Sequence, residues 1–496
     1  MLSSPEDVNA RTSHIVVIGG GIAGLAAAHR LLGSGARVTL IEASDRLGGK
    51  LRAGEIAGVS VDLGAESMLA RRPEAVELAR AVGLADRLQP PATASATVWT
   101  RDALRPMPKG HVMGVPGDPA ALSGLLSPEG IARIERERDL PPAELGDDVA
   151  VGAYVAERLG REVVDRLVEP LLGGVYAGDA YKISMRAAVP QLFEAVKTQG
   201  SLLAAVRDLQ ARTAAAAVQQ DQPVFMGIAG GIGTLPGAVA EAVRAGGGEI
   251  LTETPVHELT RTDRGWQIRA GRRVIAADGV VLATPAWSAS ALLADESPAA
   301  AAELGRIEYA SMALVTMAFR RADLGRMPEG SGFLVPPVDG RTIKASTFST
   351  RKWGWVDEGS SELFLLRTSI GRYGEEEQLD REDGELVDVS LRDLGEAVGL
   401  GAGFGSGSGA GAGPAAKPVA TEVTRWIGGL PQYPVGHLTR VARIRDEVAK
   451  LPGLRVCGAA YDGVGIPACI ASARRAADEI IATSTLVRVT GDDAGE

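Results

Sequence analysis

The chain has 496 residues, of which 45% are hydrophobic and 23% are charged, so its composition is globular and its length allows more than one domain. Its formal net charge of −10 argues against nucleic acid as a partner. Two cysteines, Cys457 and Cys469, are too few for a disulfide framework, and five scattered histidines predict no metal site. The sequence shows no apolar signal segment and no long uncharged apolar run, so we expect a cytoplasmic protein with at most peripheral membrane contact.

The first predicted elements form a strand–helix–strand unit. Residues 14–18 (HIVVI) are a β-branched strand, and GGGIAG follows at once. A helical pattern then leads to a second strand at 37–42 (RVTLIE). This order is typical of a nucleotide-binding βαβ unit.

Helical patterns dominate from 74 to 215, and strand patterns return from 222. We therefore predict an α/β fold, α+β overall, in which a discontinuous Rossmann-like nucleotide-binding domain carries a β-sheet substrate domain and an inserted helical domain. The expected limits are 13–73, 222–300 and 425–486 for the nucleotide-binding parts, 74–215 for the helical insertion and 301–424 for the β domain. Within the β domain, the Gly- and Ser-rich stretch 401–418 is expected to be a flexible insertion, because it cannot bury enough surface to order itself.

The glycines after the first strand have the spacing of a dinucleotide fingerprint. Gly19 permits a tight turn, Gly21 lets the backbone approach a pyrophosphate, and Gly24 lets helix and strand pack closely. The helix N-terminus offers free N–H groups to the anion. Glu42 ends the next strand, where a carboxylate binds a ribose diol and disfavours a 2′-phosphate. The alternative is a glycine-rich turn in another α/β fold.

The residues after Glu42 separate FAD from NAD. The segment EASDRLGGKLRA places Arg46, Gly49 and Lys50 directly behind the acid. This segment resembles the flavin-dependent amine oxidase and protoporphyrinogen oxidase superfamily, in which the loop lines the pyrophosphate and flavin. The resemblance implies FAD as cofactor. Arg46 and Lys50 would neutralise phosphate or polarise the ring, although a surface salt bridge is the alternative for Arg46.

Three further segments match the same superfamily. VDLGAES (61–67) resembles the segment beneath the isoalloxazine ring, and VVLATPA (280–286) resembles a strand and turn that return to the nucleotide. The resemblance implies that the backbone of Val256 meets adenine. For the side chain of Val256, core packing is the alternative.

Near the end of the chain, YDGVGIPACI (461–470) closely resembles the porphyrinogen oxidase form of the last superfamily motif. There a helix N-terminus approaches the flavin pyrimidine and favours the reduced anion. Pro467 suits the start of that helix. Cys469 is expected to pack rather than to act as a redox thiol. The cofactor-binding residues that the resemblance implies are Gly19, Gly20, Gly21, Ile22, Ala23, Gly24, Glu42, Ala43, Arg46, Gly49, Lys50, Gly64, Ala65, Glu66, Ser67, Val256, Trp426, Val464, Gly465 and Ile466.

The resemblance implies an oxygen-dependent oxidoreductase of haem biosynthesis. GAESMLARR (64–72) is similar to the Gram-positive type of enzyme, which oxidises coproporphyrinogen III to coproporphyrin III by three hydride transfers to FAD with release of peroxide. Protoporphyrinogen IX is the alternative substrate. A flavin amine or carotenoid oxidoreductase and a tetrapyrrole carrier are the alternative functions. Product transfer to a ferrochelatase is a further expectation.

The expected substrate contacts are few, because this chemistry needs little acid–base machinery. Arg72 is the predicted propionate partner, since arginine binds carboxylate in a bidentate fashion. Glu66 either accepts a proton or binds backbone, and Gly174 and Val175 are expected to place backbone against the macrocycle. Lys344, Arg351 and Lys352 are secondary cation candidates, while a solvated surface position is the alternative for Arg71 and Arg72.

Overall fold

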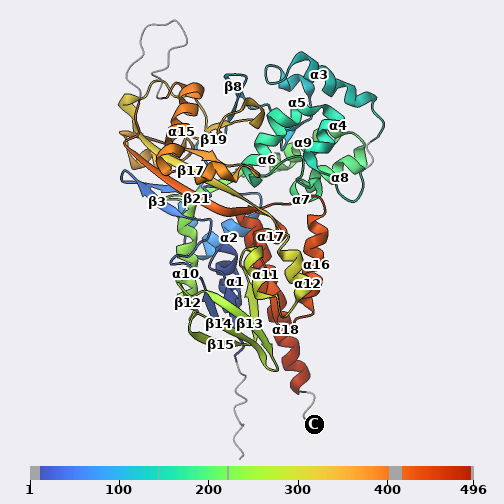
Figure 1. The fold of residues 1–496 in the computed structure, drawn as a ribbon, viewed down its shortest axis with the longest axis vertical. Coiled ribbons are helices and arrows are strands. Elements are labelled where there is room, and N and C mark those ends of the chain that lie inside the picture. The colour runs from blue at the N-terminus through green and yellow to red at the C-terminus, as the bar shows by residue number, and fades with distance from the viewer. Residues whose placement is uncertain (1–11, 143–144, 220–222, 401–415, 493–496) are drawn as a thin grey trace, which may run out of the picture.

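A computed structural model describes residues 12–142, 145–219, 223–400 and 416–492. Figure 1 shows a parallel sheet with its helices at the C-terminal end of the molecule, a large mixed sheet at the other end, and a cluster of helices beside that mixed sheet. Most of the predicted flexible insertion, residues 401–415, lies outside the described residues. Of the helices that are described, none has the length and apolarity to cross a bilayer.

The parallel sheet is assembled from three distant parts of the chain. Its strand order is β12-β2-β1-β16-β22, and every pairing is parallel. All five residues of β1 are buried, as expected for a strand covered on both faces. One face packs against α1, α10 and α18, and the other against a three-stranded antiparallel sheet and helices α11, α12 and α16. The bounds are β1 (His14–Ile18), α1 (Ile22–Leu32), β2 (Arg37–Ile41), α10 (Leu235–Ala245), β12 (Glu249–Leu251), β13 (Val256–Thr262), β14 (Gly265–Ala270), β15 (Arg273–Ala277), β16 (Gly279–Leu282), α11 (Ala286–Leu292), α12 (Pro298–Leu304), α16 (His437–Ala449), β22 (Leu454–Val456) and α18 (Ile466–Asp492).

The mixed sheet has seven strands in the order β21-β17-β20-β19-β18-β7-β8. Helix α15 (Asp383–Val398) contributes to the hydrophobic cluster on one face. The strands β7 and β8 come from the stretch 74–215, which the sequence predicted to be mainly helical, and they join the sheet because β7 pairs in parallel with β18. The bounds are β7 (Thr97–Thr100), β8 (Ala103–Pro106), β17 (Tyr309–Arg320), β18 (Gly332–Leu334), β19 (Ile343–Thr347), β20 (Leu363–Ile370) and β21 (Ala420–Pro431).

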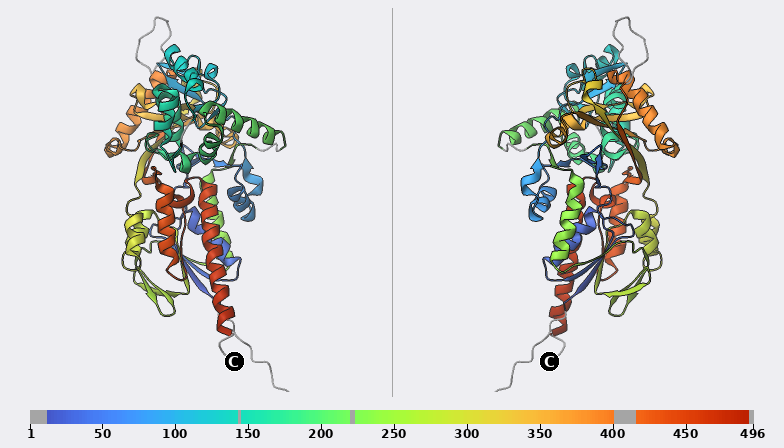
Figure 2. Two further views of the ribbon diagram at one scale, coloured as in Figure 1. Left: turned by 90° about the vertical axis from the view of Figure 1, so that its right-hand side faces the viewer. Right: turned by 90° about the vertical axis from the view of Figure 1, so that its left-hand side faces the viewer.

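The helical cluster occupies most of the remaining predicted insertion. Its helices share one apolar core, and α9 extends sideways from the body in both views of Figure 2. Helix α2 (Pro73–Ala81) lies elsewhere: it packs with α1, α10 and α18 beside the parallel sheet. The mixed helix-and-strand fold is therefore confirmed, while the numerical domain limits stay a prediction. The main helices are α3 (Pro128–Glu135), α4 (Val151–Leu159), α6 (Glu169–Tyr176), α8 (Pro190–Gln199) and α9 (Leu202–Gln219).

Candidate active site

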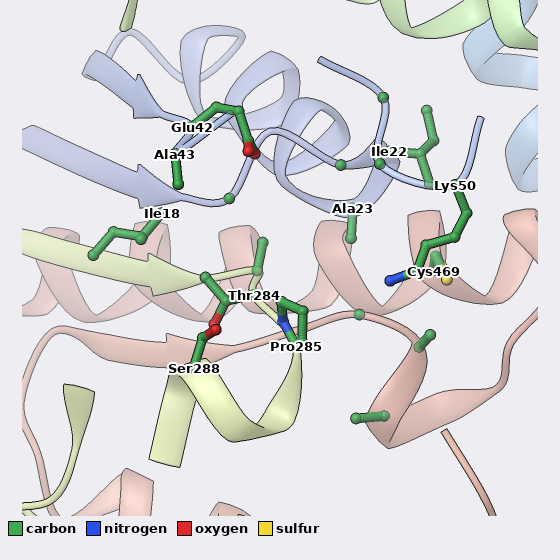
Figure 3. Close-up of a pocket in the computed structure, with 18 of the residues that line it drawn as sticks. Ile18, Ile22, Ala23, Glu42, Ala43, Lys50, Thr284, Pro285, Ser288 and Cys469 are labelled. Atoms are coloured by element: carbon green, nitrogen blue, oxygen red, sulfur yellow. The ribbon is translucent and has the colours of Figure 1, made fainter. Parts of the chain in front are cut away.

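A cavity of about 720 Å³ lies at the carboxyl ends of the parallel strands. Ligands bind at this edge in open α/β sheets. Segments from all three parts of the nucleotide-binding region line it, and Figure 3 shows the loop before α1 on one side and the start of α18 on another. The predicted residues among its lining are Gly19, Gly21, Ile22, Ala23, Glu42, Ala43, Gly49, Lys50, Ala65, Val256, Val464 and Ile466.

The three fingerprint glycines have different local surroundings. Gly19 has φ +109°, and a Cβ there would lie 2.6 Å from the carbonyl oxygen of Ala283. At Gly24 a Cβ would lie 1.8 Å from the carbonyl oxygen of Gly19, so close packing of helix on strand requires glycine. At Gly21 an added Cβ meets no atom within 4 Å, because the position faces the cavity. Gly21 is the N-cap of α1 and no side chain caps the helix, which leaves its first N–H groups for an anion.

Glu42 stands at the rim of the cavity at the end of β2. Its Oε2 accepts a hydrogen bond from the backbone N–H of Gly20 at 2.6 Å. Its Oε1 accepts from the backbone N–H of Ser44 at 2.9 Å and from the Ser44 hydroxyl at 2.8 Å. These bonds fix the orientation of the carboxylate, which lines the cavity where a ribose diol would need an acceptor.

Lys50 brings a positive charge into the cavity. Figure 3 shows its side chain reaching from the loop toward Cys469 on α18. Desolvation by the surrounding protein lowers the pKa of Lys50. Burial likewise raises the pKa of Cys469 to about 12, so this thiol stays protonated and acts as a packing group.

The glycine-rich segment before α18 forms the opposite wall. Val464, Ile466 and Cys469 line the cavity, and the N–H of Cys469 donates to the carbonyl oxygen of Gly465 at 3.0 Å as the helix begins. Gly463 has φ +131°, a conformation that disfavours other residues. The two glycine-rich segments, more than 400 positions apart in the sequence, therefore face one cavity.

Several predicted residues lie behind the cavity wall and support it. Arg46 donates to the carbonyl oxygen of Gly49 at 2.7 Å, and its guanidinium lies 5.6 Å from the ring centroid of Trp426. Trp426 Nε1 donates to the carbonyl oxygen of Leu63 at 3.2 Å. A Cβ at Gly64 would lie 2.1 Å from the carbonyl oxygen of Lys50, so two backbone segments meet there. Four further predicted residues do not line the cavity, namely Gly20, Gly24, Ser67 and Gly465.

Glu66 is held in a buried cluster of charges. Lys352 forms a short ion pair with Oε1, and Arg367 Nη2 lies 3.1 Å from Oε2. Burial by itself would raise the pKa of Glu66, but Arg367 and Lys352 outweigh it and the pKa is lowered. An ionised, doubly paired carboxylate is a poor proton acceptor. The sequence predicted that Glu66 accepts a proton or binds backbone, and neither prediction included an ion pair with Lys352 or Arg367.

The predicted substrate residues lie outside the cavity wall. Arg72 is the N-cap of α2, its side chain is 44% exposed, and its Nη2 lies 2.8 Å from Oε1 of Glu74. Gly174 and Val175 are exposed on α6. A Cβ at Gly174 would lie 3.8 Å from Leu334, an ordinary contact, so the protein alone does not require glycine there.

Other lining residues have no sequence signal. Tyr309 of β17 borders the cavity, and its hydroxyl oxygen accepts a hydrogen bond at 2.9 Å from the backbone N–H of Ala286, the first residue of α11. Thr254 and Ser288 also line it. Arg367, the partner of Glu66, does not line the cavity and lies in the segment LLRTSIGR (365–372), to which the sequence assigned no function. In the described part of the chain no group of three or more His, Cys, Asp or Glu is placed to hold a metal.

A model of flavin-containing amine oxidoreductases matches residues 22–481. The chain belongs to that family. As a family member it is an FAD-dependent oxidoreductase, which confirms the cofactor and the enzyme class predicted from sequence. FAD suits the cavity chemically, because uncapped N–H groups, an open Gly21 and a fixed Glu42 match a pyrophosphate and a ribose.

Relatives within this family of flavin oxidoreductases match nearly the full length of the chain. It is 36% identical to coproporphyrinogen III oxidase of Mycobacterium bovis over 476 residues, covering 94% of this chain and 96% of the relative. It is 31% identical to coproporphyrinogen III oxidase of Bacillus subtilis over 480 residues, with 94% and 98% covered. The crystal structure of a putative protoporphyrinogen oxidase from Exiguobacterium sp. 255-15 matches with a TM-score of 0.81 at 31% identity, covering 95% of this chain and 99% of that one.

Proposed function

We propose that this flavin oxidoreductase oxidises coproporphyrinogen III to coproporphyrin III in haem biosynthesis, with oxygen as the final acceptor. The observation that carries the proposal is the cavity shared by the dinucleotide loop and the start of α18, in a chain alignable over 94% of its length with coproporphyrinogen III oxidases. When bound, FAD supplies hydride acceptance and passes the electrons on to oxygen.

The protein's own residues bind the cofactor and the substrate, orient them and neutralise their negative charges. The N-terminus of α1 and Lys50 offset the negative charge of the cofactor phosphates or ring, and Glu42 orients the ribose. Glu66 acts as a positioning residue: its pairs with Lys352 and Arg367 fix the segment next to Ala65, which lines the cavity. Arg72 and the exposed backbone at Gly174 remain the proposed contacts for a propionate and for the macrocycle.

Protoporphyrinogen IX is the second candidate substrate. The structural match named as a putative protoporphyrinogen oxidase favours it, whereas the relatives named as coproporphyrinogen III oxidases favour the four-carboxylate substrate. A tetra-anion needs several cations, and four lie in or close after β19 and β20, namely Lys344, Lys352, Arg367 and Arg372. We propose that the product then passes to a ferrochelatase.

The test compares both porphyrinogens on one preparation of the FAD-loaded protein. Porphyrin fluorescence and oxygen consumption are recorded at matched concentrations. We expect the higher kcat/KM with coproporphyrinogen III. A preference for protoporphyrinogen IX would select the second candidate, and oxidation of amines with neither porphyrinogen turned over would refute both.

A further inference from the structure

Lys344 on β19 is a buried cation without a carboxylate partner in the described ranges. Its exposed fraction is 7%, and its ammonium lies 4.0 Å from the Sδ of Met312, a weak acceptor. Two other deeply buried charged groups are paired with opposite charges. Arg158 pairs with Glu137 at 2.7 Å, and Glu66 pairs with Lys352 and Arg367. A buried charge is costly unless it is paired, so Lys344 is suited to an anionic ligand.

Arg372 is the second cation near Lys344, and Glu375, Glu169 and Asp393 are the carboxylates that act on this pair. Arg372 lies close enough to act on Lys344, and its Nη1 is 3.6 Å from Oε2 of Glu375. Arg372 also donates to the carbonyl oxygens of Val335 and Ile343. Glu375 interacts electrostatically with both Arg372 and Lys344. From α6, Glu169 faces Arg372, and burial raises the pKa of Glu169 to about 7.

Lys344 shares a sheet face with Arg367. On β20, Leu366 and Ile370 belong to the core under α15, so Arg367 and Ser369 point to the opposite face. Met312 alternates with the core residue Ala313, so its contact places the lysine on that same face. The pairings are Ala345 with Ser369 and Thr347 with Arg367, with a bulge at Lys344. Lys344 is thus three residues, or about 10 Å, along β19 from the position beside Arg367.

Helix α6 faces this side of the sheet and leaves open space there. Leu171, Gly174 and Val175 have the spacing of one helix face, and a Cβ at Gly174 would meet Leu334 of β18. Gly174 and Val175 are nevertheless exposed, and Leu334, Ala345 and Ser369 are only half-buried. The facing surfaces of α6 and the sheet, which both keep exposed residues, are the proposed substrate slot. Arg367 marks the end of the slot near the cofactor, since it binds the carbonyl oxygen of Gly64.

We propose that Lys344 binds a carboxylate of the substrate at the end of this slot away from Arg367, and so selects substrates with carboxylates on more than one side. This assignment rests on the proposed function. It gives the substrate a direction: its reacting centre lies toward Gly64 and Ala65, and one of its charged side chains lies toward Lys344. A four-carboxylate tetrapyrrole can place a carboxylate at Lys344 in more orientations than a two-carboxylate one.

The test titrates FAD-loaded protein with coproporphyrin III and with protoporphyrin IX, followed by porphyrin fluorescence. Lys344→Met removes the charge at similar length, and Lys450→Met, at a side chain 65% exposed, is the matched control. We expect the Kd for coproporphyrin III to rise about tenfold or more in Lys344→Met, with a smaller change for protoporphyrin IX and none in the control. Burial lowers the pKa of Lys344 to about 7. The wild-type affinity should therefore also fall above pH 7 more steeply than that of Lys344→Met, because only the wild type loses the ammonium.

A second variant covers the case in which Lys344→Met does not fold. Met312→Glu places a carboxylate beside the ammonium, which should preserve folding and weaken coproporphyrin binding by competing for the charge. An unchanged Kd in either variant would overturn the assignment, as would a lower kcat with unchanged Kd. If the wild type neither binds nor oxidises a porphyrin, the proposed function fails first and the assignment falls with it.

Discussion

Arg367 donates from Nη1 to the carbonyl oxygen of Gly64 at 2.8 Å, across 303 positions of sequence. The same guanidinium reaches the carbonyl oxygen of Asp62 at 3.3 Å and the carboxylate of Glu66 at 3.1 Å. One side chain of β20 therefore ties the seven-stranded sheet to the segment that borders the cofactor cavity. These bonds hold the segment 62–66, which borders the cofactor cavity, in a fixed position against the sheet.

Replacing Arg367 by Met should destabilise the protein by about 3 kcal/mol, because it leaves the buried Glu66 with one cation fewer and frees two carbonyl oxygens. Urea unfolding followed by tryptophan fluorescence measures the change. Arg273→Met is the control, since its pair with Glu249 is exposed on both sides. The double variant Glu66→Gln with Arg367→Met should recover part of the loss, and equal losses in the single and double variants would contradict the coupling.

Gly21→Val should abolish FAD binding while leaving the fold intact. The added side chain meets no protein atom at its Cβ and instead extends into the cavity. Gly237→Val is the matched control, because an added Cβ there also meets nothing and the position lies outside the cavity lining. The flavin absorbance of the purified proteins provides the measurement, and a normal flavin content in Gly21→Val would refute this use of the loop.

Arg72→Glu should raise KM for coproporphyrinogen III several-fold with the flavin still bound, since it reverses a charge at the proposed propionate contact and adds repulsion against Glu74. The effect should shrink at high salt, because this position is partly exposed. Arg80→Glu, an exposed charge reversal on the same helix, is the control. Steady-state kinetics at two ionic strengths decide the matter, and unchanged kinetics remove Arg72 from the substrate site.

His437 should make stability depend on pH between about 4 and 6.5. Burial lowers its pKa to about 4 from 6.5, and its ring stacks on Tyr433 at 4.3 Å. The unfolded chain then takes up the proton first, so stability present at pH 7 is lost as pH falls through 6.5 toward 4, by up to about 3 kcal/mol. His437→Phe should flatten this part of the profile, and His257→Gln on an exposed strand position should not. Urea midpoints at pH 7, 6 and 5 test the slope.

The local elements of the nucleotide-binding region followed from sequence because their signals are short-range. The buried run His14–Ile18, the glycines before α1 and the acid at Glu42 are read within about 30 residues. The helix expected to start near Pro467 is α18, which begins at Ile466 after neighbouring glycines. Family likeness of the motifs then identified the flavin chemistry.

The partners of the buried charged residues were determined only by the tertiary structure. Sequence named Glu66 but neither Lys352 nor Arg367 as its partners, and it assigned 97–106 to a helical region although those strands complete the mixed sheet. It likewise gave Lys344 no more weight than Arg351, which pairs at the surface with Glu329. Periodicity and glycine spacing report only the conformation of neighbouring residues. Burial and charge pairing depend on which distant strands share a sheet and in what register, and these are fixed when the whole chain packs.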